Sequence, residues 1–291
     1  MDNEEKTLRL IMPQWQGGNN ISYHFGAQLL AWLAPVSDDE TIEVPISTDP
    51  TIDKKEDGIV AKNQIMQQTL SALTILQNRN PERVVVLGGD CSVELAPFAY
   101  LAEKYQEDLA ILWIDAHPDI KTAELYSHYH AMILATLLGE GDTDLASLVS
   151  SKVDPSRLVF AGINDEKEKS PYVYKKFNFP NVSSEEFASS SEKVIAALRA
   201  TGASRIAIHF DLDVLDMHEF RSQGIARPDR YEEYVRKGLK RSSMQSVTRL
   251  IQDVNNEFDV VGLGITEHLP WDALSLSKML HNLPLLKKQK L

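Results

Sequence analysis

The sequence has few features that would place the protein outside the cell or in a membrane. Its single cysteine, Cys91, excludes a disulfide bond within the chain. No apolar run approaches the about 20 residues that a membrane-spanning helix requires. The first residues, MDNEEKTLRL, lack the basic start and the apolar stretch of a secretion signal. We therefore expect a cytoplasmic protein that has no membrane partner.

Positive charge is also scarce in this chain. It has 30 Lys and Arg residues against 42 Asp and Glu residues, which gives a formal net charge of −12. An acidic surface repels the phosphate backbone, so nucleic acid is not an expected partner. With 291 residues, of which 43% are hydrophobic, the chain is long enough to bury a substantial core.

No repeat and no linker rich in Pro, Gly or Ser divides the chain, so we expect a single domain over residues 1–291. Several short runs are rich in Val, Ile and Leu with little polar alternation, which is typical of strands covered on both faces. Helical patterns separate these runs, and the alternation predicts an α/β fold with a mainly parallel sheet. The expected strands are 83–87, 109–114, 157–163, 205–210 and 259–265, and the expected helices are 63–76, 93–105, 185–202 and 229–241.

Acidic residues follow each of the expected strands. The five segments are GGDCS, DAHPD, NDE, DLD and TEH, in chain order. Ligands of open parallel sheets bind at the carboxyl ends of the strands. Several acidic strand ends on one edge would repel each other in an empty site, and a bound cation would remove that penalty. The sequence therefore predicts a cation site at this edge.

Two of these segments have the spacing of metal ligands. In DAHPD, Asp115, His117 and Asp119 are two residues apart and would point to the same side if the segment stays extended. Asp211 and Asp213 repeat this spacing in DLD. A single D-x-D is common in turns, but two such motifs at strand ends favour a metal site. Carboxylate and imidazole ligands suit one or two divalent ions of the Mn, Fe, Co or Zn type.

In order and approximate spacing, these motifs resemble the signatures of the arginase, agmatinase and formiminoglutamase (ureohydrolase) family. GGDCS is similar to its GGDHS, DAHPD to its DAHxD, and DLDVLD to its DxDxxDP. The resemblance covers roughly residues 80–270, and PQWQGG is similar to the family's N-terminal loop. It implies a three-layer α/β/α sandwich, a centre of two Mn²⁺ per chain and a homo-oligomer.

The resemblance also implies ligand roles for the matching positions. Asp115 and Asp211 would bridge the two metals. His117 and Asp213 would hold one metal. Asp119 would hold the other metal and touch the bridging hydroxide.

Three further positions match residues that act on the substrate. His130 stands at the histidine of the family's HG motif and would be the proton shuttle, although His128 is an alternative for that role. Glu267 would pair with a guanidinium group. Asp165 would recognise substrate, or it would be an exposed residue of the charged loop NDEKEKS.

These roles together imply a hydrolytic mechanism. Water that bridges two cations has a lowered pKa and supplies hydroxide, which attacks the guanidinium carbon. Asp119 would accept the hydroxide proton, and His130 would deliver a proton to the leaving amine.

Cys91 departs from the family, which has the histidine of GGDHS as its first metal ligand. A thiolate at this position would favour a softer ion such as Zn²⁺. Alternatively the site holds only one metal firmly, or Cys91 is a small buried side chain without a ligand role. The sequence leaves these alternatives open, so Zn²⁺ or a single metal stands beside the expected pair of Mn²⁺ ions.

The loop after the DAHPD motif departs as well. Lys121 and Tyr126 stand where arginases place the Asn and Ser that bind the amino-acid end of arginine, and the segment up to His130 is about two residues shorter. We therefore expect L-arginine to be a poor substrate.

The expected function is hydrolysis of a non-peptide C–N bond in a linear amidine, that is, a guanidino or formimino compound. One alternative is a one-metal amide deacetylase that uses Asp115, His117 and Asp211. Another alternative is a metal-binding family member without activity.

Overall fold

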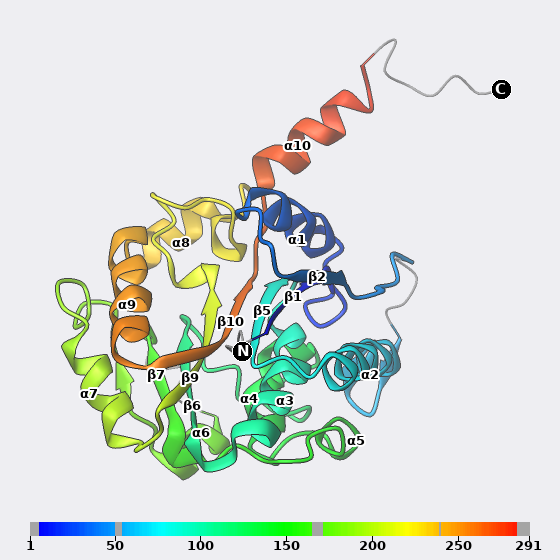
Figure 1. The fold of residues 1–291 in the computed structure, drawn as a ribbon. Helices are drawn as coiled ribbons and strands as arrows, with labels where there is room; N and C mark the ends of the chain where they lie inside the picture. Colours follow the sequence, from blue (N-terminus) through cyan, green and yellow to red (C-terminus); the bar gives the residue numbers. More distant parts are fainter. Residues whose placement is uncertain (1–5, 50–53, 165–170, 239, 284–291) are drawn as a thin grey trace.

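The computed structural model describes residues 6–49, 54–164, 171–238 and 240–283 (Figure 1). Its centre is an eight-stranded sheet with the order β2-β1-β5-β10-β9-β6-β7-β8, and every neighbouring pair is parallel. A short antiparallel pair, β3 (Lys55–Glu56) and β4 (Ile59–Val60), lies apart from it. The strands of the large sheet are β1 (Thr7–Met12), β2 (Glu40–Glu43), β5 (Arg83–Gly88), β6 (Leu109–Ile114), β7 (Leu158–Ala161), β8 (Asn181–Val182), β9 (Arg205–Asp211) and β10 (Asp259–Thr266).

Both faces of the sheet are covered by helices, as strand β6 shows. Its residues Leu109, Ile111 and Trp113 face one apolar core, which α2 and α3 cover. The alternate residues Ala110 and Leu112 face a second core, which α7 and α9 cover. The three-layer α/β/α architecture predicted from the sequence is confirmed.

The helices that the structure describes vary widely in length. Within the described ranges, no helix has both the length and the apolar character needed to cross a bilayer. They are α1 (Ser22–Leu33), α2 (Lys62–Arg79), α3 (Leu95–Tyr105), α4 (Ile133–Leu137), α5 (Thr143–Ala146), α6 (Tyr172–Phe177), α7 (Glu192–Ala200), α8 (Tyr231–Lys237), α9 (Met244–Glu257) and α10 (Trp271–Leu280).

All five predicted strands and all four predicted helices are present. The helix predicted over 63–76 is longer in the structure, as α2 (Lys62–Arg79), and the other three are shorter than predicted. The helix predicted from residue 93 begins at Leu95, after a 3₁₀ turn over Cys91–Glu94, and Pro97 lies in its first turn. The helix predicted from residue 185 begins only at Glu192. The elements that were not predicted are strands β1, β2, β3, β4 and β8 and helices α1, α4, α5, α6, α9 and α10. The edge strands β2 and β8 are short and partly exposed, so they lack the apolar runs that marked the central strands.

The loop after β5 is bonded to the loop after β1. The backbone N–H of Gly89 donates to the carbonyl of Met12 (2.8 Å), and that of Asp90 donates to the carbonyl of Gln14 (3.0 Å). A Cβ atom at Gly89 would overlap the carbonyl of Gln14, so only glycine allows the two backbones to approach this closely. This contact fixes the loop that joins the end of β5 to Cys91.

Replacing Gly89 with Ala should therefore destabilise the protein by about 1–3 kcal/mol, the usual range for overpacking a buried contact. The measurement is urea unfolding followed by circular dichroism. Gly224→Ala is the matched control, because the nearest atom to a Cβ there is 4.0 Å away. Equal unfolding free energies for the two variants would show that the loop contact is not a constraint.

Candidate metal centre

The central strands bring acidic residues together at one edge of the sheet. Strands β5, β10, β9 and β6 are consecutive in the sheet and parallel, so their carboxyl ends coincide. Cys91 follows β5, Glu267 follows β10, Asp211 ends β9 and Asp115 follows β6. All four side chains are buried. A cluster of carboxylates and one thiol thus lies at the edge where the sequence predicts a cation site.

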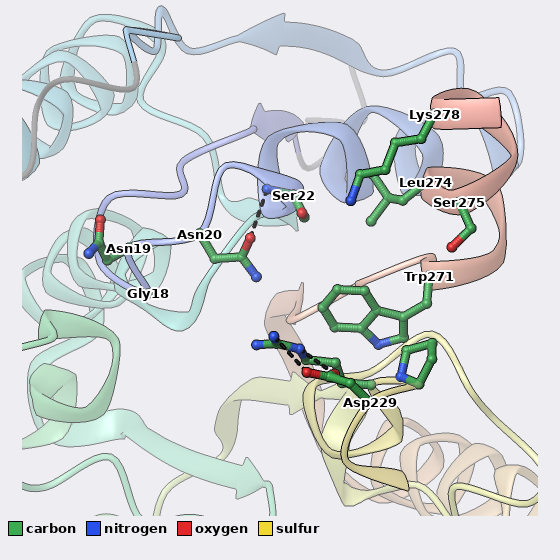
Figure 2. A pocket seen from close by; sticks show the side chains of 11 residues that line it. Gly18, Asn19, Asn20, Ser22, Asp229, Trp271, Leu274, Ser275 and Lys278 are labelled. Atoms are coloured by element: carbon green, nitrogen blue, oxygen red, sulfur yellow. Dashed lines mark hydrogen bonds and ion pairs between the residues drawn. The ribbon is translucent and has the colours of Figure 1, made fainter. Parts of the chain in front are cut away.

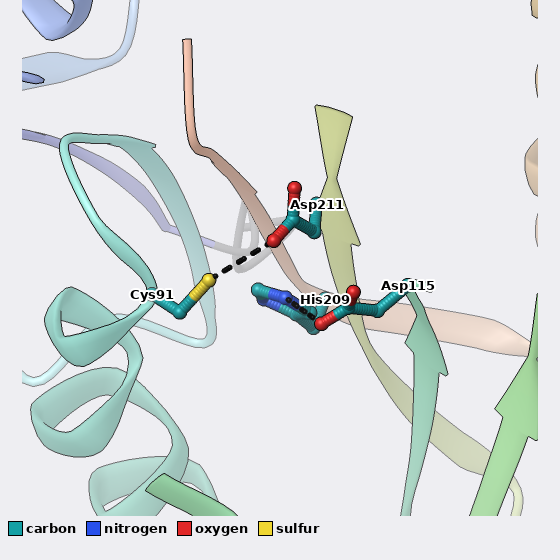
Figure 3. A group of neighbouring side chains, drawn as sticks. All are labelled: Cys91, Asp115, His209 and Asp211. Carbon is teal, nitrogen blue, oxygen red and sulfur yellow. Dashed lines mark hydrogen bonds and ion pairs between the residues drawn. The ribbon is translucent and has the colours of Figure 1, made fainter. Parts of the chain in front are cut away.

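Two groups of side chains in the described part of the chain have the spacing of a metal site. In the first group, ligand atoms of Cys91, Asp115, His209 and Asp211 all lie within 4.8 Å of one another (Figure 3). In the second group, the same holds for Asp115, His117 and Asp213. Asp115 belongs to both groups, which is the arrangement expected of a carboxylate that serves two neighbouring ions.

Local hydrogen bonds orient these carboxylates. The backbone N–H of His117 donates to Asp115 Oδ1 (2.7 Å), and that of Asp213 donates to Asp211 Oδ1 (2.6 Å). The assumption that DAHPD stays extended is wrong, because the chain bends over residues 115–117. This bend brings His117 Nδ1 to 2.9 Å from Asp213 Oδ2 and to 3.5 Å from Asp115 Oδ1.

Asp119 lies beside these groups but belongs to neither of them. It is buried, its backbone has a φ of +43°, and among the described residues its Oδ2 has no hydrogen-bond partner. Burial and then the negative charge of Asp115 raise the pKa of Asp119 to about 8. A cation near this carboxylate would favour its charged form.

Glu267 and His130 form a pair next to Cys91, whose Sγ lies 3.6 Å from Glu267 Oε1. The backbone of Glu267 has a φ of +65°, and its N–H donates to the carbonyl of Gly89 (2.8 Å). Its Oε1 accepts from the backbone N–H of Cys91 (3.2 Å) and lies 3.4 Å from His130 Nδ1. Burial lowers the pKa of His130, but the hydrogen bond and charge of Glu267 outweigh this effect and raise that pKa to about 9. The contact with Glu267 thus favours the protonated form of His130.

The remaining candidates lie as follows. His128 stands next to His130, with 6.2 Å between the ring centroids. Tyr126 stacks on His130 (6.1 Å), and the Lys121 ammonium lies 5.2 Å from the centre of the Tyr126 ring. Asp165 lies outside the described residues.

Asp90 organises the loop after β5 and belongs to neither metal-ligand group. Its carboxylate accepts from the backbone N–H groups of Ser92 (2.9 Å) and Gly18 (3.0 Å). These bonds join the loop after β5 to the N-terminal loop. Asp90 thus stabilises the conformation of the loop that contains Cys91.

Sequence reasoning missed two buried polar residues of the site, His209 and Glu94. Both side chains are 0% exposed, and His209 belongs to the first metal-ligand group. The signal for His209 was present, because it interrupts an apolar strand two residues before Asp211 and therefore lies on the same face. Glu94 lies in an apolar helical pattern that gave no sign of a functional role. The glycine at position 264 of strand β10 is the sequence feature related to it, because a Cβ atom there would overlap the Glu94 carboxylate.

The electrostatics of the cluster fit bound divalent metal. Burial and then the charges of Asp213 and Asp115 raise the pKa of Asp211, and burial and then the charge of Asp211 raise the pKa of Cys91. Three buried atoms of the cluster have no hydrogen-bond partner among the described residues, namely Asp119 Oδ2, Asp213 Oδ1 and His209 Nε2. Such atoms are costly unless they bind something. Oxygen, nitrogen and sulfur donors of this kind are ligands for Mn, Co or Zn ions.

A hollow of about 650 Å³ lies beside the cluster, between the loop at residues 18–22 and helix α10 (Figure 2). Trp271 and Lys278 project toward it from α10, and Asn19 and Asn20 line its other side. None of the sequence-predicted site residues lines this hollow. Gly18, which does line it, lies next to His130, because a Cβ atom at Gly18 would be 3.3 Å from His130 Nδ1. The two groups of metal-ligand atoms thus lie outside the lining of the hollow.

Comparison with protein families and structures places this arrangement among known proteins. The model of the Arginase family matches residues 16–270. An arginase of Staphylococcus aureus is 29% identical over 175 residues, which are 58% of this chain and 56% of that protein. The chain thus matches little more than half the length of this relative.

Solved structures extend the likeness in fold. The arginase of Entamoeba histolytica superposes with a TM-score of 0.76 and 19% identity over 91% of both chains. The formimidoylglutamase of Bacillus subtilis superposes with a TM-score of 0.66 and 15% identity, covering 93% of this chain and 82% of that one. These likenesses establish the arginase-like fold.

The repulsion within the cluster leads to a prediction for Asp211→Asn. Without metal, this variant should unfold a few degrees above wild type, because it removes a carboxyl group whose ionised form is disfavoured by burial and by the charges of Asp213 and Asp115. Wild type should gain stability when metal is added, by about 2.7 kcal/mol at 100 times the Kd. The variant should lose most of that gain, because it loses a charged ligand.

Thermal unfolding with EDTA and with added Mn²⁺ or Zn²⁺ measures both effects. Asp272→Asn, on the exposed face of α10, is the control and should behave as wild type. If Asp211→Asn gains as much from metal as wild type does, Asp211 is not a ligand.

A second prediction concerns Cys91. Replacing it with His restores the ligand type that the family has at this position, so Mn²⁺ occupancy should rise. Cys91→Ser should instead weaken Zn²⁺ binding, because the thiolate is lost. The measurement is titration of Mn²⁺ and Zn²⁺ into the three proteins after chelation. Equal affinities of all three proteins for both ions would place Cys91 outside the ligand set.

Proposed function

The chain belongs to the arginase family, and we propose that it is a metal-dependent hydrolase of a C–N bond in a guanidino or formimino compound. The observation that carries this proposal is the position of Asp115, which belongs to two adjacent groups of ligand atoms. One-metal sites do not require such a shared carboxylate. The proposal includes two divalent ions per chain, with Mn²⁺ as the first candidate, and the cytoplasmic location and homo-oligomeric state expected from the sequence.

Six residues would hold the ions. Asp115 and Asp211 would serve both, and a thiolate at Cys91 would make its own position suitable for Zn²⁺ as well. Divalent ions held in this way would activate water as the nucleophile. The six proposed ligands are Cys91, Asp115, His117, Asp119, Asp211 and Asp213.

Three side chains would handle the substrate and the protons. Asp119 has a buried oxygen that accepts no hydrogen bond from the described residues, so it can accept a proton from the nucleophile. His130 would donate a proton to the leaving amine from its position 3.4 Å from Glu267. Glu267 would bind the cationic guanidinium or amidine group, which would take over the contact that it now makes with His130.

The loop over residues 121–126 bears on the choice of substrate. Lys121 and Tyr126 form a cation–π contact beside His130, where arginases have Asn and Ser. A lysine ammonium at this position would repel the α-ammonium group of arginine. Asp165 stays a candidate for substrate recognition. The substrate is therefore an amidine whose far end differs from that of L-arginine.

A one-metal amide deacetylase is the second candidate function. It is favoured by one observation, that Asp115, His117 and Asp213 form a complete three-ligand group by themselves, with Asp213 in place of the Asp211 expected from the sequence. Three protein ligands and an open position are typical of a catalytic site with one metal.

The test is a panel of guanidino, formimino and acetylated amine compounds, assayed for release of urea, formamide or acetate with Mn²⁺, Co²⁺ and Zn²⁺. We expect urea or formamide from at least one amidine, and turnover of L-arginine at least about tenfold below that of the best substrate. Asp213→Ala should abolish the activity, whereas the exposed Asp272→Asn should retain it. Acetate release alone, with one metal per chain, would support the deacetylase and contradict the proposal.

A further inference from the structure

His209 is a buried imidazole inside the central sheet, directly below Asp211. It lies on β9 with a side chain that is 0% exposed, and its ring stacks on Trp113 with 3.7 Å between the centroids and an angle of 22°. The indole N–H of Trp113 donates to Asp115 Oδ2 (3.0 Å). Packing therefore holds the plane of the His209 ring and the carboxylate of Asp115 in fixed positions.

The two ring nitrogens of His209 have different environments. Nδ1 lies 3.4 Å from Glu94 Oε1. Nε2 has no hydrogen-bond partner in the described part of the chain, and its distance to Asp115 Oδ2 is 3.7 Å, too long for a hydrogen bond. Figure 3 shows the ring between Cys91 and Asp115, below Asp211. A fully buried nitrogen thus faces the carboxylates and the thiol without a hydrogen bond from the described residues, at ion-pair distance from Asp115.

Glu94 has the position of a carboxylate that orients a ligating histidine. It is 0% exposed, at the end of the 3₁₀ turn that begins with Cys91, and the absence of a side chain at Gly264 makes room for it. Histidines that bind metal almost always donate their second ring N–H to a carboxylate, a carbonyl or water. A hydrogen bond donated by His209 Nδ1–H to Glu94 would fix the tautomer whose Nε2 is free to bind.

We propose that His209 is a metal ligand, and that Cys91, Asp115, His209 and Asp211 form a four-ligand site for a borderline-soft divalent ion such as Zn²⁺, with Glu94 as a positioning residue. This rests on the proposed function in so far as Asp115 and Asp211 hold metal. Sulfur, nitrogen and oxygen atoms within 4.8 Å of one another suit tetrahedral coordination.

A tetrahedral site with four protein ligands has no open position for substrate or water. The two ions would therefore have different roles. The ion at the Cys91 group would be held firmly and would orient Asp115 and Asp211. The ion at the group of Asp115, His117 and Asp213 would keep the open position that substrate needs. The alternative explanation is that His209 is protonated and binds no metal. Its positive charge would then neutralise Glu94 and Asp115, which lie on either side of it.

The experiment is a titration of Co²⁺ into the full-length protein after chelation, with ¹⁵N-labelled histidine. A thiolate-to-cobalt absorption band reports Cys91, and hyperfine-shifted ¹⁵N resonances report ligating imidazoles. In wild type we expect the absorption band and shifted resonances from two histidines, His117 and His209. His209→Gln should lose one of these and bind its first Co²⁺ at least about 100-fold more weakly.

Two further variants separate coordination from structure. Glu94→Gln keeps the shape of the side chain, and it should weaken Co²⁺ binding by about 10- to 100-fold while both histidines remain shifted. It also tests the proposal should His209→Gln fail to fold. His218→Gln is the control, since the side chain of His218 is 62% exposed and lies on the surface.

Each outcome bears on a different claim. Two ions per wild-type chain with only one shifted histidine, or a His209→Gln variant with unchanged Co²⁺ affinity, would overturn the role of His209 and leave the proposed function standing. A wild-type protein that takes up no metal would overturn both. A single ion that shifts His209 and gives the thiolate band would support the four-ligand site and contradict the two-metal hydrolase.

Discussion

The concentration of negative charge at one edge of the sheet is the constraint on which the rest of the site depends. The carboxylates of Asp115, Asp119 and Asp211 are buried beside one another, and the pKa values of Asp119 and Asp211 are raised by burial and by their neighbours' charges. Such a cluster opposes folding unless protons, cationic side chains or metal ions neutralise it. Of these three, divalent ions both neutralise the carboxylates and can activate water for hydrolysis.

The surrounding fold is arranged to hold this cluster rigidly. Gly89 and Gly264 leave space for the Gln14 carbonyl and for Glu94, and Asp119 and Glu267 adopt left-handed backbone conformations that L-residues rarely take. Positive φ at such residues is tolerated only where neighbouring contacts enforce it. For Glu267 one such contact is its backbone hydrogen bond to Gly89. Two residues with positive φ and two close glycine contacts thus lie where the carboxylates meet.

The central strands and the ligand motifs were predictable because each carries a dense local signal. An apolar run followed by DAHPD or DLD specifies both a buried strand and what lies at its end. The edge strands, in contrast, are short and partly exposed. They form because they pair with neighbouring strands, and their own amino-acid composition does not indicate a strand. His209 and Glu94 were missed because each is a single polar residue in an apolar pattern. Their partnership exists only after β9 and the turn after β5 are brought together by the sheet. Asp119 was predicted as a ligand, and the structure places it beside the ligand groups and not within them.

The central claim is that this edge of the sheet holds two divalent ions through different ligand sets. The most direct measurement is a crystal structure of the metal-loaded protein with anomalous diffraction recorded at the Mn and Zn absorption edges. We expect two peaks that share Asp115, one within bonding distance of Cys91 Sγ and His209 Nε2 and the other within bonding distance of His117 Nδ1. No anomalous peak beside Asp115, with His209 in contact only with Glu94, would contradict the claim.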